Sequence, residues 1–476
     1  MRISLIALAG TLLGASLVAA PQSSQVATSA AAAAAPTFYK DVLPVLQKNC
    51  QACHRPGEVA PMSLLTYEQT RPWARAIKNA VATKQMPPWF ADPAYGHFSN
   101  ERRLSAREIT AINAWVDAGA PAGNPSDAPA ALTFENGWNI KPDIIVEMPK
   151  AFPIPAAGTI NYKYVLVKGV FTEDLWVSAA EMRPGNSKVL HHGKVWVRPP
   201  GSKWMARAAF GEAYERESHR AIMGDNMIEE GNDILGKFNP GLGAQRFDID
   251  GAAKFIPKGS DLVFELHYTT SGEPMSDASK LGLVLAKQAP KTRYYFHAGP
   301  TAMNLAIPAS DSNAQVVSEI TFGEEARLVY AQPHMHLRGK DFELRVVTPD
   351  KRITTVLKGA WNFEWQMGYQ YAEPIALPKG SRLQLITHFD NSTANRFNPD
   401  ATKKVVWGPQ NWDEMSNCFI GVLFPTGTAP ENVFLRSGPS MLPRGENGPT
   451  LASFAQVDPN AVGKASNASS GGASVP

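Results

Sequence analysis

The sequence contains one pair of cysteines whose spacing points to a definite chemistry, Cys50-Gln-Ala-Cys53-His54. Two thiols one helical turn apart can add to the two vinyl groups of a haem, and the adjacent histidine then binds the iron. The same spacing also occurs in thiol–disulfide redox pairs and in half of a zinc site. A redox pair should open a βαβ unit and a zinc site needs more ligands nearby, whereas this segment has a helical pattern and only His97 is close. The motif therefore predicts one covalently attached c-type haem.

Residues 37–122 resemble a class of small bacterial cytochrome c domains. In that class Met-Pro-Pro-Trp follows the haem motif and a helix that carries a tryptophan closes the domain, as Met86-Pro-Pro-Trp89 and Trp115 do here. The resemblance implies that Met86 is the second axial ligand of the iron, with Met62 and His97 as the alternatives. A histidine–methionine pair suits electron transfer and leaves no open position for O₂.

Five further histidines fall in three tight groups within strand-like sequence. His334-Met-His336 places two imidazoles on one face of a strand, about 6.6 Å apart, where both can bind one metal ion. His191-His192 are adjacent, so their side chains converge only at the end of a strand or at a β-bulge. His267 stands alone in its segment and is not diagnostic by itself.

Together these positions resemble the copper type II, ascorbate-dependent monooxygenases, the family of peptidylglycine α-hydroxylating monooxygenase and dopamine β-monooxygenase. The match rests on four segments in the family's order: His191-His192, His267, His334-Met-His336-Leu-Arg-Gly339 and Asp413-Glu-Met-Ser-Asn417. The resemblance implies one copper ion on His191, His192 and His267, which stores and passes an electron. It implies a second, catalytic copper ion on His334, His336 and Met415, which binds O₂.

The two resemblances predict an exported, haem-fused, copper-dependent monooxygenase that hydroxylates a C–H bond of a small organic substrate with O₂. The c-type haem would relay electrons from an external donor to the two copper ions. Two other interpretations stay open. One is a non-catalytic electron-transfer protein with a copper-binding β-sandwich module. The other is a haem module joined to a β-sandwich binding module in which the histidines are structural.

The elements that must position these residues change in character along the chain. Helical periodicity covers residues 37–122 and is clearest from Ser105 to Ala118, where Ser105 and Glu108 predict a capping box. Beyond residues 120–132 apolar residues alternate with a period of two, as in strands, for example at 163–171, 261–268, 342–347 and 381–387. We therefore expect a multidomain chain, with a small all-α cytochrome c domain followed by two all-β jelly-roll-like sandwiches.

The expected boundaries are a signal peptide (1–20), a low-complexity linker (21–36), the cytochrome c domain (37–122), an N-terminal copper monooxygenase β-sandwich (133–300), a C-terminal one (301–445) and a disordered tail (446–476). A positive start and an apolar run from Ile3 to Val18, followed by Ala19-Ala20, predict export to the periplasm or secretion. An uncleaved membrane anchor is the alternative. We expect no membrane span after cleavage.

Composition excludes other classes of protein. The 476 residues are 44% hydrophobic and 19% charged, enough to bury several cores, so the chain is not wholly disordered. A formal net charge of +3 without Lys/Arg runs argues against a nucleic-acid partner. Three cysteines cannot form a disulfide framework, and Cys418 is expected to be a buried thiol. The remaining histidines are expected to be structural: His97, His219, His297 and His388.

Overall fold

The computed structural model describes residues 35–435, except 59, 135–136, 216–218, 220–221, 223–232, 240–241 and 409. The signal peptide predicted at 1–20, most of the linker predicted at 21–36 and the tail predicted at 446–476 lie outside the described residues. The described residues are mostly β, with 36% in strands and 14% in helices. Within the described part, no helix is both long enough and apolar enough to cross a membrane.

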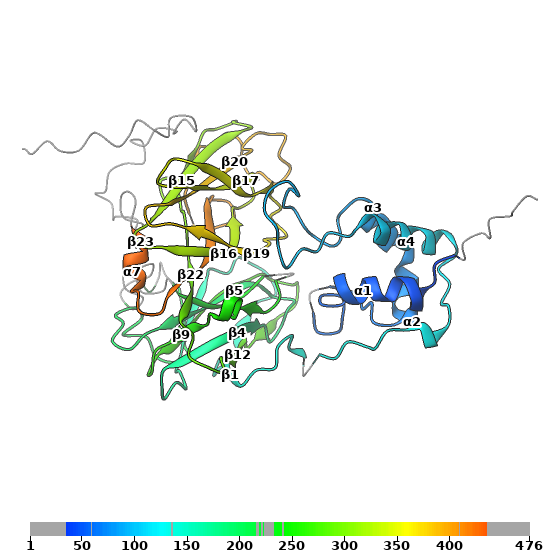
Figure 1. Ribbon diagram of the computed structural model, residues 1–476, viewed down its shortest axis with the longest axis horizontal. Coiled ribbons are helices and arrows are strands. Elements are labelled where there is room, and N and C mark those ends of the chain that lie inside the picture. Colours follow the sequence, from blue (N-terminus) through cyan, green and yellow to red (C-terminus); the bar gives the residue numbers. More distant parts are fainter. Residues whose placement is uncertain are drawn as a thin grey trace, which may run out of the picture. The chain divides into compact units, whose positions relative to one another are not determined.

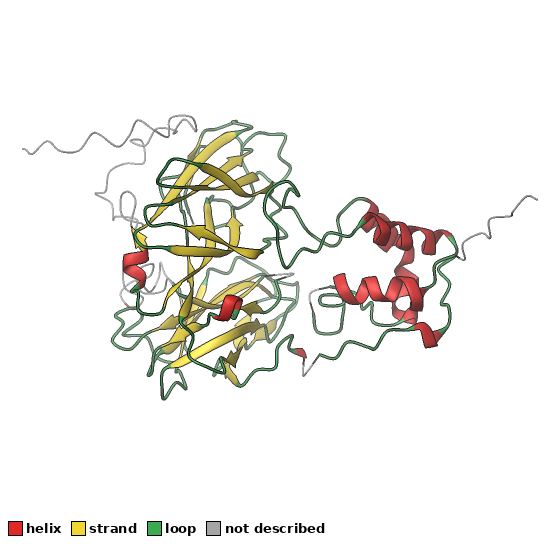
Figure 2. Ribbon diagram, in the orientation of Figure 1, coloured by secondary structure: helices red, strands yellow, loops and turns green. Residues whose placement is uncertain are grey.

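Helices gather in the part of the chain before residue 130 (Figure 2). In chain order they are η1 (Phe38–Val42), α1 (Leu43–Asn49), α2 (Tyr67–Thr70), η2 (Arg71–Trp73), α3 (Ala74–Ala82), α4 (Ala106–Asp117) and η3 (Pro125–Asp127), with η5 (Ile249–Gly251) and α7 (Pro430–Val433) further on. At the start of α4 the Ser105 hydroxyl accepts from the backbone N–H of Glu108, whose carboxylate accepts from the backbone N–H of Ser105. The predicted capping box is thereby confirmed.

The remainder is built from four sheets of four or five strands each, together with two pairs of short strands (Figure 1). Sheet I contains β1 (Ile144–Glu147), β12 (Lys280–Leu285), β4 (Leu175–Arg183), β8 (Gln245–Arg246) and β9 (Lys254–Ile256). Sheet II has the order β6 (Ala213–Tyr214), β3 (Lys163–Val167), β10 (Asp261–Tyr268), β5 (Leu190–Arg198) and β7 (Ile234–Phe238).

Sheet III has the order β13 (Thr292–His297), β22 (Asn417–Pro425), β16 (Ala326–His334) and β19 (Tyr369–Leu377). Sheet IV has the order β18 (Ile353–Ala360), β17 (Gly339–Val347), β20 (Arg382–Phe389), β15 (Ala314–Phe322) and β23 (Phe434–Leu435). The short pairs are β2 (Phe152–Ile154) with β11 (Met275–Asp277), and β14 (Ala306–Ile307) with β21 (Val405–Val406). The strands expected from alternating residues at 163–171, 261–268, 342–347 and 381–387 correspond to β3, β10, β17 and β20.

Sheet III buries side chains on both of its faces. Ile420 and Val422 of β22 pack in one core together with residues of sheet IV. Phe419 and Leu423 of the same strand pack in a second core together with residues of sheets I and II. Because successive residues of a strand point to opposite faces, one strand supplies both cores.

The predicted fold class, a small all-α cytochrome c domain followed by two all-β jelly-roll-like sandwiches, is wrong. The four sheets are not divided between two independent sandwiches, because sheet III is common to both cores. The helical segment is no separate domain either, because residues from Pro36 onward form one compact unit. Periodicity locates helices and strands, but it carries no information about which core their apolar faces enter.

The helical segment is attached to the sheets at two places. After α3 the Trp89 ring packs 5.0 Å from the Tyr369 ring of β19, between centroids, and the Ser99 N–H donates to the Gln370 carbonyl at 2.8 Å. Next to the Cys-x-x-Cys-His turn, Glu58 accepts from Arg55 at 2.9 Å and from Arg183 of β4 at 2.8 Å. These contacts hold the predicted haem-attachment turn against sheet I.

Candidate metal centre

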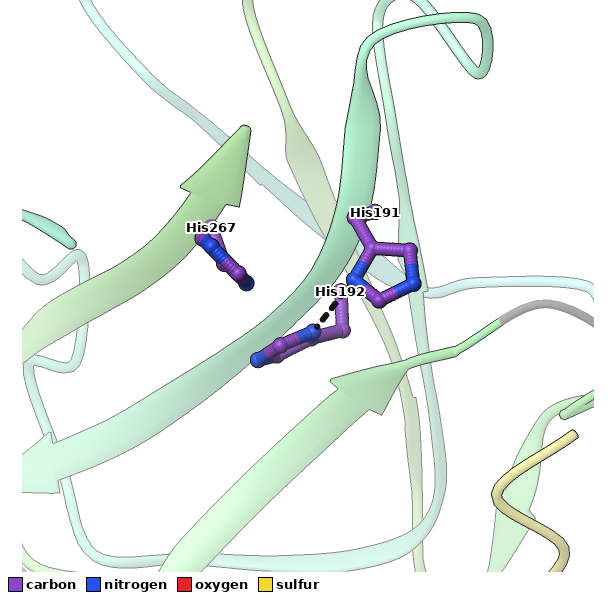
Figure 3. Close-up of side chains that lie close together, drawn as sticks. All are labelled: His191, His192 and His267. Carbon is purple, nitrogen blue, oxygen red and sulfur yellow. Dashed lines mark hydrogen bonds between the residues drawn. The ribbon is translucent and has the colours of Figure 1, made fainter. Parts of the chain in front are cut away.

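Three of the predicted copper ligands converge in sheet II. His191 and His192 lie on β5 and His267 lies on the adjacent strand β10, with the three rings gathered in one place (Figure 3). His267 pairs with His192 and Tyr268 pairs with Leu190, so His191 is an extra residue without a partner. This is a β-bulge, which frees His191 from the strict alternation of the strand. The irregularity that the adjacent histidines require is therefore present.

The nitrogens of this histidine triad are spaced as metal ligands are. One ring nitrogen from each residue lies within 4.8 Å of those of the other two, and the Nδ1 atoms of His191 and His192 are 3.1 Å apart. An ion that binds imidazole at about 2.0–2.1 Å brings two such nitrogens to about 3 Å from each other. The buried Nδ1 of His267 has no hydrogen-bond partner among the described residues. The triad thus fits a single metal ion.

Tyr162 is a member of this site that the sequence does not mark. Its ring stacks on that of His267, with centroids 4.6 Å apart and planes 13° apart, and its phenol oxygen lies 2.7 Å from Nε2 of His192. With Nε2 of His192 engaged by the phenol, Nδ1 is the nitrogen left to face an ion. A partner on the other ring nitrogen fixes the orientation and tautomer of a metal-binding histidine.

His334 and His336 form a second group at the end of β16, with ring centroids 5.2 Å apart. Gln366, in the loop between β18 and β19, places its Oε1 2.8 Å from Nδ1 of His334. Nδ1 of His336 is buried without a hydrogen-bond partner in the described part of the chain. This pair therefore offers a half-buried and a buried imidazole, with ring planes 88° apart, for a metal ion.

Met415 lies on the segment that runs beside this pair. The register of β16 and β22 pairs His334 with Asn417, two residues after Met415. The buried Glu414 carboxylate accepts backbone N–H bonds from His336 at 2.8 Å, Arg338 at 2.6 Å and Met415 at 3.3 Å. Burial raises the pKa of Glu414 to about 8, while these donors oppose that shift. Glu414 thus ties the Met415 segment to the His336 segment.

Burial favours the neutral form of all five imidazoles, which is the form that binds metal. Burial is the largest cause, and it lowers the pKa of His267 to about 3 and that of His336 to about 4. Burial also lowers the pKa values of His191, His192 and His334. The positive charge of Lys194 also lowers the pKa values of His192, His267, His334 and His336.

The two histidine groups are neighbours. His334 contributes to the lowered pKa of His192, and His336 contributes to that of His267. The loop between β18 and β19 contacts both groups: the Phe363 ring lies 6.1 Å from that of His191, and the Trp361 indole N–H donates to the His336 carbonyl at 3.0 Å. Neither aromatic residue is marked by a sequence motif.

The predicted haem-attachment residues lie in one tight turn after α1. The Cys50 carbonyl accepts from the backbone N–H groups of Cys53 at 3.1 Å and His54 at 2.9 Å, and both thiols are free. Burial raises the pKa of Cys50 to about 12 and also raises that of Cys53. Thiol–disulfide exchange needs a thiolate, so a redox pair fits these thiols poorly.

The candidate axial ligands Met62 and Met86 lie in different surroundings. Met62 is partly buried against the core that also contacts Cys50, and its backbone lies beside the imidazole of His54. Met86 lies after α3 and precedes a cis peptide bond to Pro87. The buried Nδ1 of His54 has no hydrogen-bond partner among the described residues. The choice of Met86 as axial ligand stays a prediction.

Comparisons with known proteins leave the family open. No protein-family model matches the chain, and no curated protein matches it. Similar solved structures include the VP2 subviral particle of infectious bursal disease virus, with 10% identity over 65% of this chain and 77% of that one, at a TM-score of 0.17. Another is the tandem CBM22 domain of Paenibacillus barcinonensis Xyn10C, with 8% identity, 60% and 80% coverage and a TM-score of 0.14. Similarity this low carries no functional argument.

Proposed function

We propose that this chain is a copper-dependent monooxygenase that hydroxylates a C–H bond of a small organic substrate with O₂, supplied with electrons through a c-type haem. The observation that carries the proposal is the convergence of His191, His192 and His267 on one point, next to the His334 and His336 pair. Five imidazoles in two adjoining groups, three of them buried and two half-buried, are a costly arrangement for a purely structural core.

The donor atoms of the two groups suit two different tasks. Three imidazoles accept either oxidation state of copper, which suits an ion that stores and passes one electron. Two imidazoles and the thioether of Met415 favour Cu(I), the state that reacts with O₂. Copper bound there would supply the one-electron chemistry and the O₂ activation that hydroxylation needs.

The protein's own groups hold these donors in place. Tyr162 fixes the His192 ring through Nε2, and Gln366 fixes the His334 ring through Nδ1. Glu414 holds the backbone of His336 against that of Met415. Burial of both groups excludes bulk water and keeps the imidazoles unprotonated. Such supporting contacts set the geometry that a metal ion must accept.

The haem-attachment turn fits an electron relay. Cys50 and Cys53 would form the two thioether bonds, and the neutral imidazole of His54 would bind the iron. Because Glu58 and Arg183 tie this turn to sheet I, the donor and the copper sites would stay within one body. Stopped-flow reduction of the haem alone tests this step, since an electron that never reaches Cu(II) contradicts the relay.

Oxygen uptake in the presence of ascorbate tests the activity. We expect the copper-loaded protein to consume O₂ in step with formation of a hydroxylated product across a panel of small organic compounds. His336→Ala should abolish that consumption, whereas His388→Ala, at a residue bonded to Asp341 and Gln315, should preserve it. Electron transfer between haem and copper without product would instead indicate the non-catalytic electron carrier.

A further inference from the structure

A buried lysine near the second histidine group has no carboxylate partner in the part of the chain that the structure describes. Lys237 of β7 is only 4% exposed, and among the described residues its ammonium donates to one acceptor, the amide oxygen of Gln332. It also lies over the Phe419 ring, 3.9 Å from the centroid. A lysine is almost never fully buried unless it is paired with an opposite charge. Two of its three N–H donors therefore have no protein acceptor in the described part of the chain.

The surroundings of Lys237 carry an excess of positive charge. Lys194 of β5 stands directly opposite Lys237 in the register of sheet II, and like charges in that position repel each other. Glu265 is the carboxylate nearby, but Lys194 at 2.7 Å and the Trp196 indole at 3.0 Å already occupy its two oxygens. Burial and the charge of Lys194 both lower the pKa of Lys237. Among the described residues, no carboxylate is left to pair with the Lys237 ammonium.

Two other lysines of the sheets are paired with carboxylates. Lys254 of β9 is fully buried, and its ammonium donates to Asp233, which also accepts from Arg293 at 3.3 Å. The Lys194 ammonium is likewise paired with the Glu265 carboxylate. Lys237 differs from both, because no carboxylate among the described residues pairs with its ammonium.

Lys237 is linked to the second histidine group by a chain of contacts. Gln332 lies two residues before His334 on β16, so the two side chains share a face of sheet III. The Gln332 amide N–H donates to the Gln366 carbonyl at 2.8 Å, and the side chain of Gln366 holds His334. The Phe419 ring lies against both Lys237 and His334, with its centroid 6.1 Å from the His334 ring. An anion on Lys237 would therefore lie beside His334.

We propose that Lys237 binds the carboxylate of a small organic acid, which lies against the aromatic face of Phe419 and Phe296 beside His334. As an assignment of substrate class this rests on the proposed function, but binding of the acid itself does not require copper. The carboxylate would accept from the two unused donors of the ammonium, and the ring faces would contact the apolar body of the acid.

Carboxylate–amide pairs of the same shape test this site. The full-length protein, copper-loaded and copper-free, is titrated by calorimetry with benzoate and benzamide, and with acetate and acetamide. We expect benzoate to bind about 10- to 100-fold more tightly than benzamide, the range of a charge-assisted hydrogen bond. Lys237→Met and Lys237→Gln should abolish this preference, and Lys237→Arg should retain it. Equal binding of acid and amide, or an unchanged preference in Lys237→Met, would overturn the proposal.

Thermal stability separates a binding lysine from a structural one. Lys237→Met removes a buried charge without leaving a carboxylate unpaired, so its Tm should not fall, whereas Lys254→Met leaves Asp233 short of a partner and should lower the Tm. An equal fall in both variants would overturn the proposal. If the protein binds no copper yet prefers benzoate through Lys237, this site stands and the proposed function fails. If hydroxylation occurs and Lys237→Met still prefers benzoate, the proposed carboxylate site at Lys237 is contradicted and the proposed function is not.

Discussion

At the scale of single residues, the donors and the groups that hold them are visible to different degrees in the sequence. Four of the histidines are marked by their spacing, whereas His267 and Met415 are marked only by the family resemblance. Tyr162 is marked by nothing in the sequence. It reaches the triad because of the register between β3 and β10. Lys163 pairs with Leu266 in that register, so the preceding residue, Tyr162, comes next to His267. Register depends on the folded sheet, so sequence reasoning missed this residue.

Tyr162→Phe removes the phenol oxygen beside His192 and keeps the stacked ring on His267. We expect the affinity of the triad for copper to fall about 10- to 100-fold, as for other partners of metal-binding histidines. Competition with a Cu(I) chelator measures this. Tyr214→Phe, whose hydroxyl accepts from the Ala209 N–H, is the matched control. Equal copper affinity in the wild type and Tyr162→Phe would contradict the assigned role.

Met415→Ala removes the proposed soft donor and leaves both histidine groups intact. We expect O₂-dependent turnover to be lost while copper at the triad is retained, because His191, His192 and His267 do not depend on Met415. Copper content and O₂ uptake are measured together, with Met275→Ala in β11 as the control. Equal loss of both copper ions would show that the donor sets are assigned wrongly.

At the scale of elements, two local features build the site. The β-bulge at His191 is inferable in advance, because adjacent histidines cannot share a face of a regular strand. The role of Glu414 could not be inferred from the sequence, although the residue stands in the segment Asp413-Glu-Met-Ser-Asn417. Its three backbone donors come from two segments that are far apart in the chain, and only the folded structure brings them together.

Glu414→Gln tests this attachment. The amide keeps one acceptor oxygen and directs an NH₂ group at backbone donors, so at least one buried N–H is left unpaired. We expect a loss of about 1–3 kcal/mol in the free energy of unfolding and loss of the copper ion at His336. Urea unfolding and copper analysis are compared with Glu324→Gln, at a surface pair with Lys379. Wild-type stability in Glu414→Gln would contradict this role.

At the scale of the whole molecule, sequence reasoning succeeds for the elements and fails for their assembly. The α4 capping box and the strands at β3, β10, β17 and β20 follow from local patterns. The expected fold class does not occur, because sheet III contributes to two cores and Trp89 of the helical segment packs on β19. An apolar residue has the same appearance in the sequence whichever core it enters.

Burial of five neutral imidazoles makes the stability of the whole chain depend on pH. In the unfolded chain they protonate near pH 6.5, whereas in the folded chain the pKa is about 3 for His267 and about 4 for His336. Between these values the unfolded state binds more protons, so stability is fully present above pH 6.5 and is lost as the pH falls.

We expect the copper-free protein to lose up to about 1.4 kcal/mol per such histidine for each pH unit below 6.5. Urea unfolding at pH 7.5, 6.0 and 5.0 measures this dependence, and His267→Gln should flatten it. The same free energy of unfolding at all three pH values would show that the imidazoles are not buried in the neutral form.

The metal content of the purified chain tests the central claim most directly. After loading and exhaustive dialysis, elemental analysis should find two copper ions and one iron ion per chain, with one copper ion lost in His267→Ala and the other lost in His336→Ala. A wild-type chain that retains no copper would contradict the account, because the five histidines would then be an ordinary part of the core.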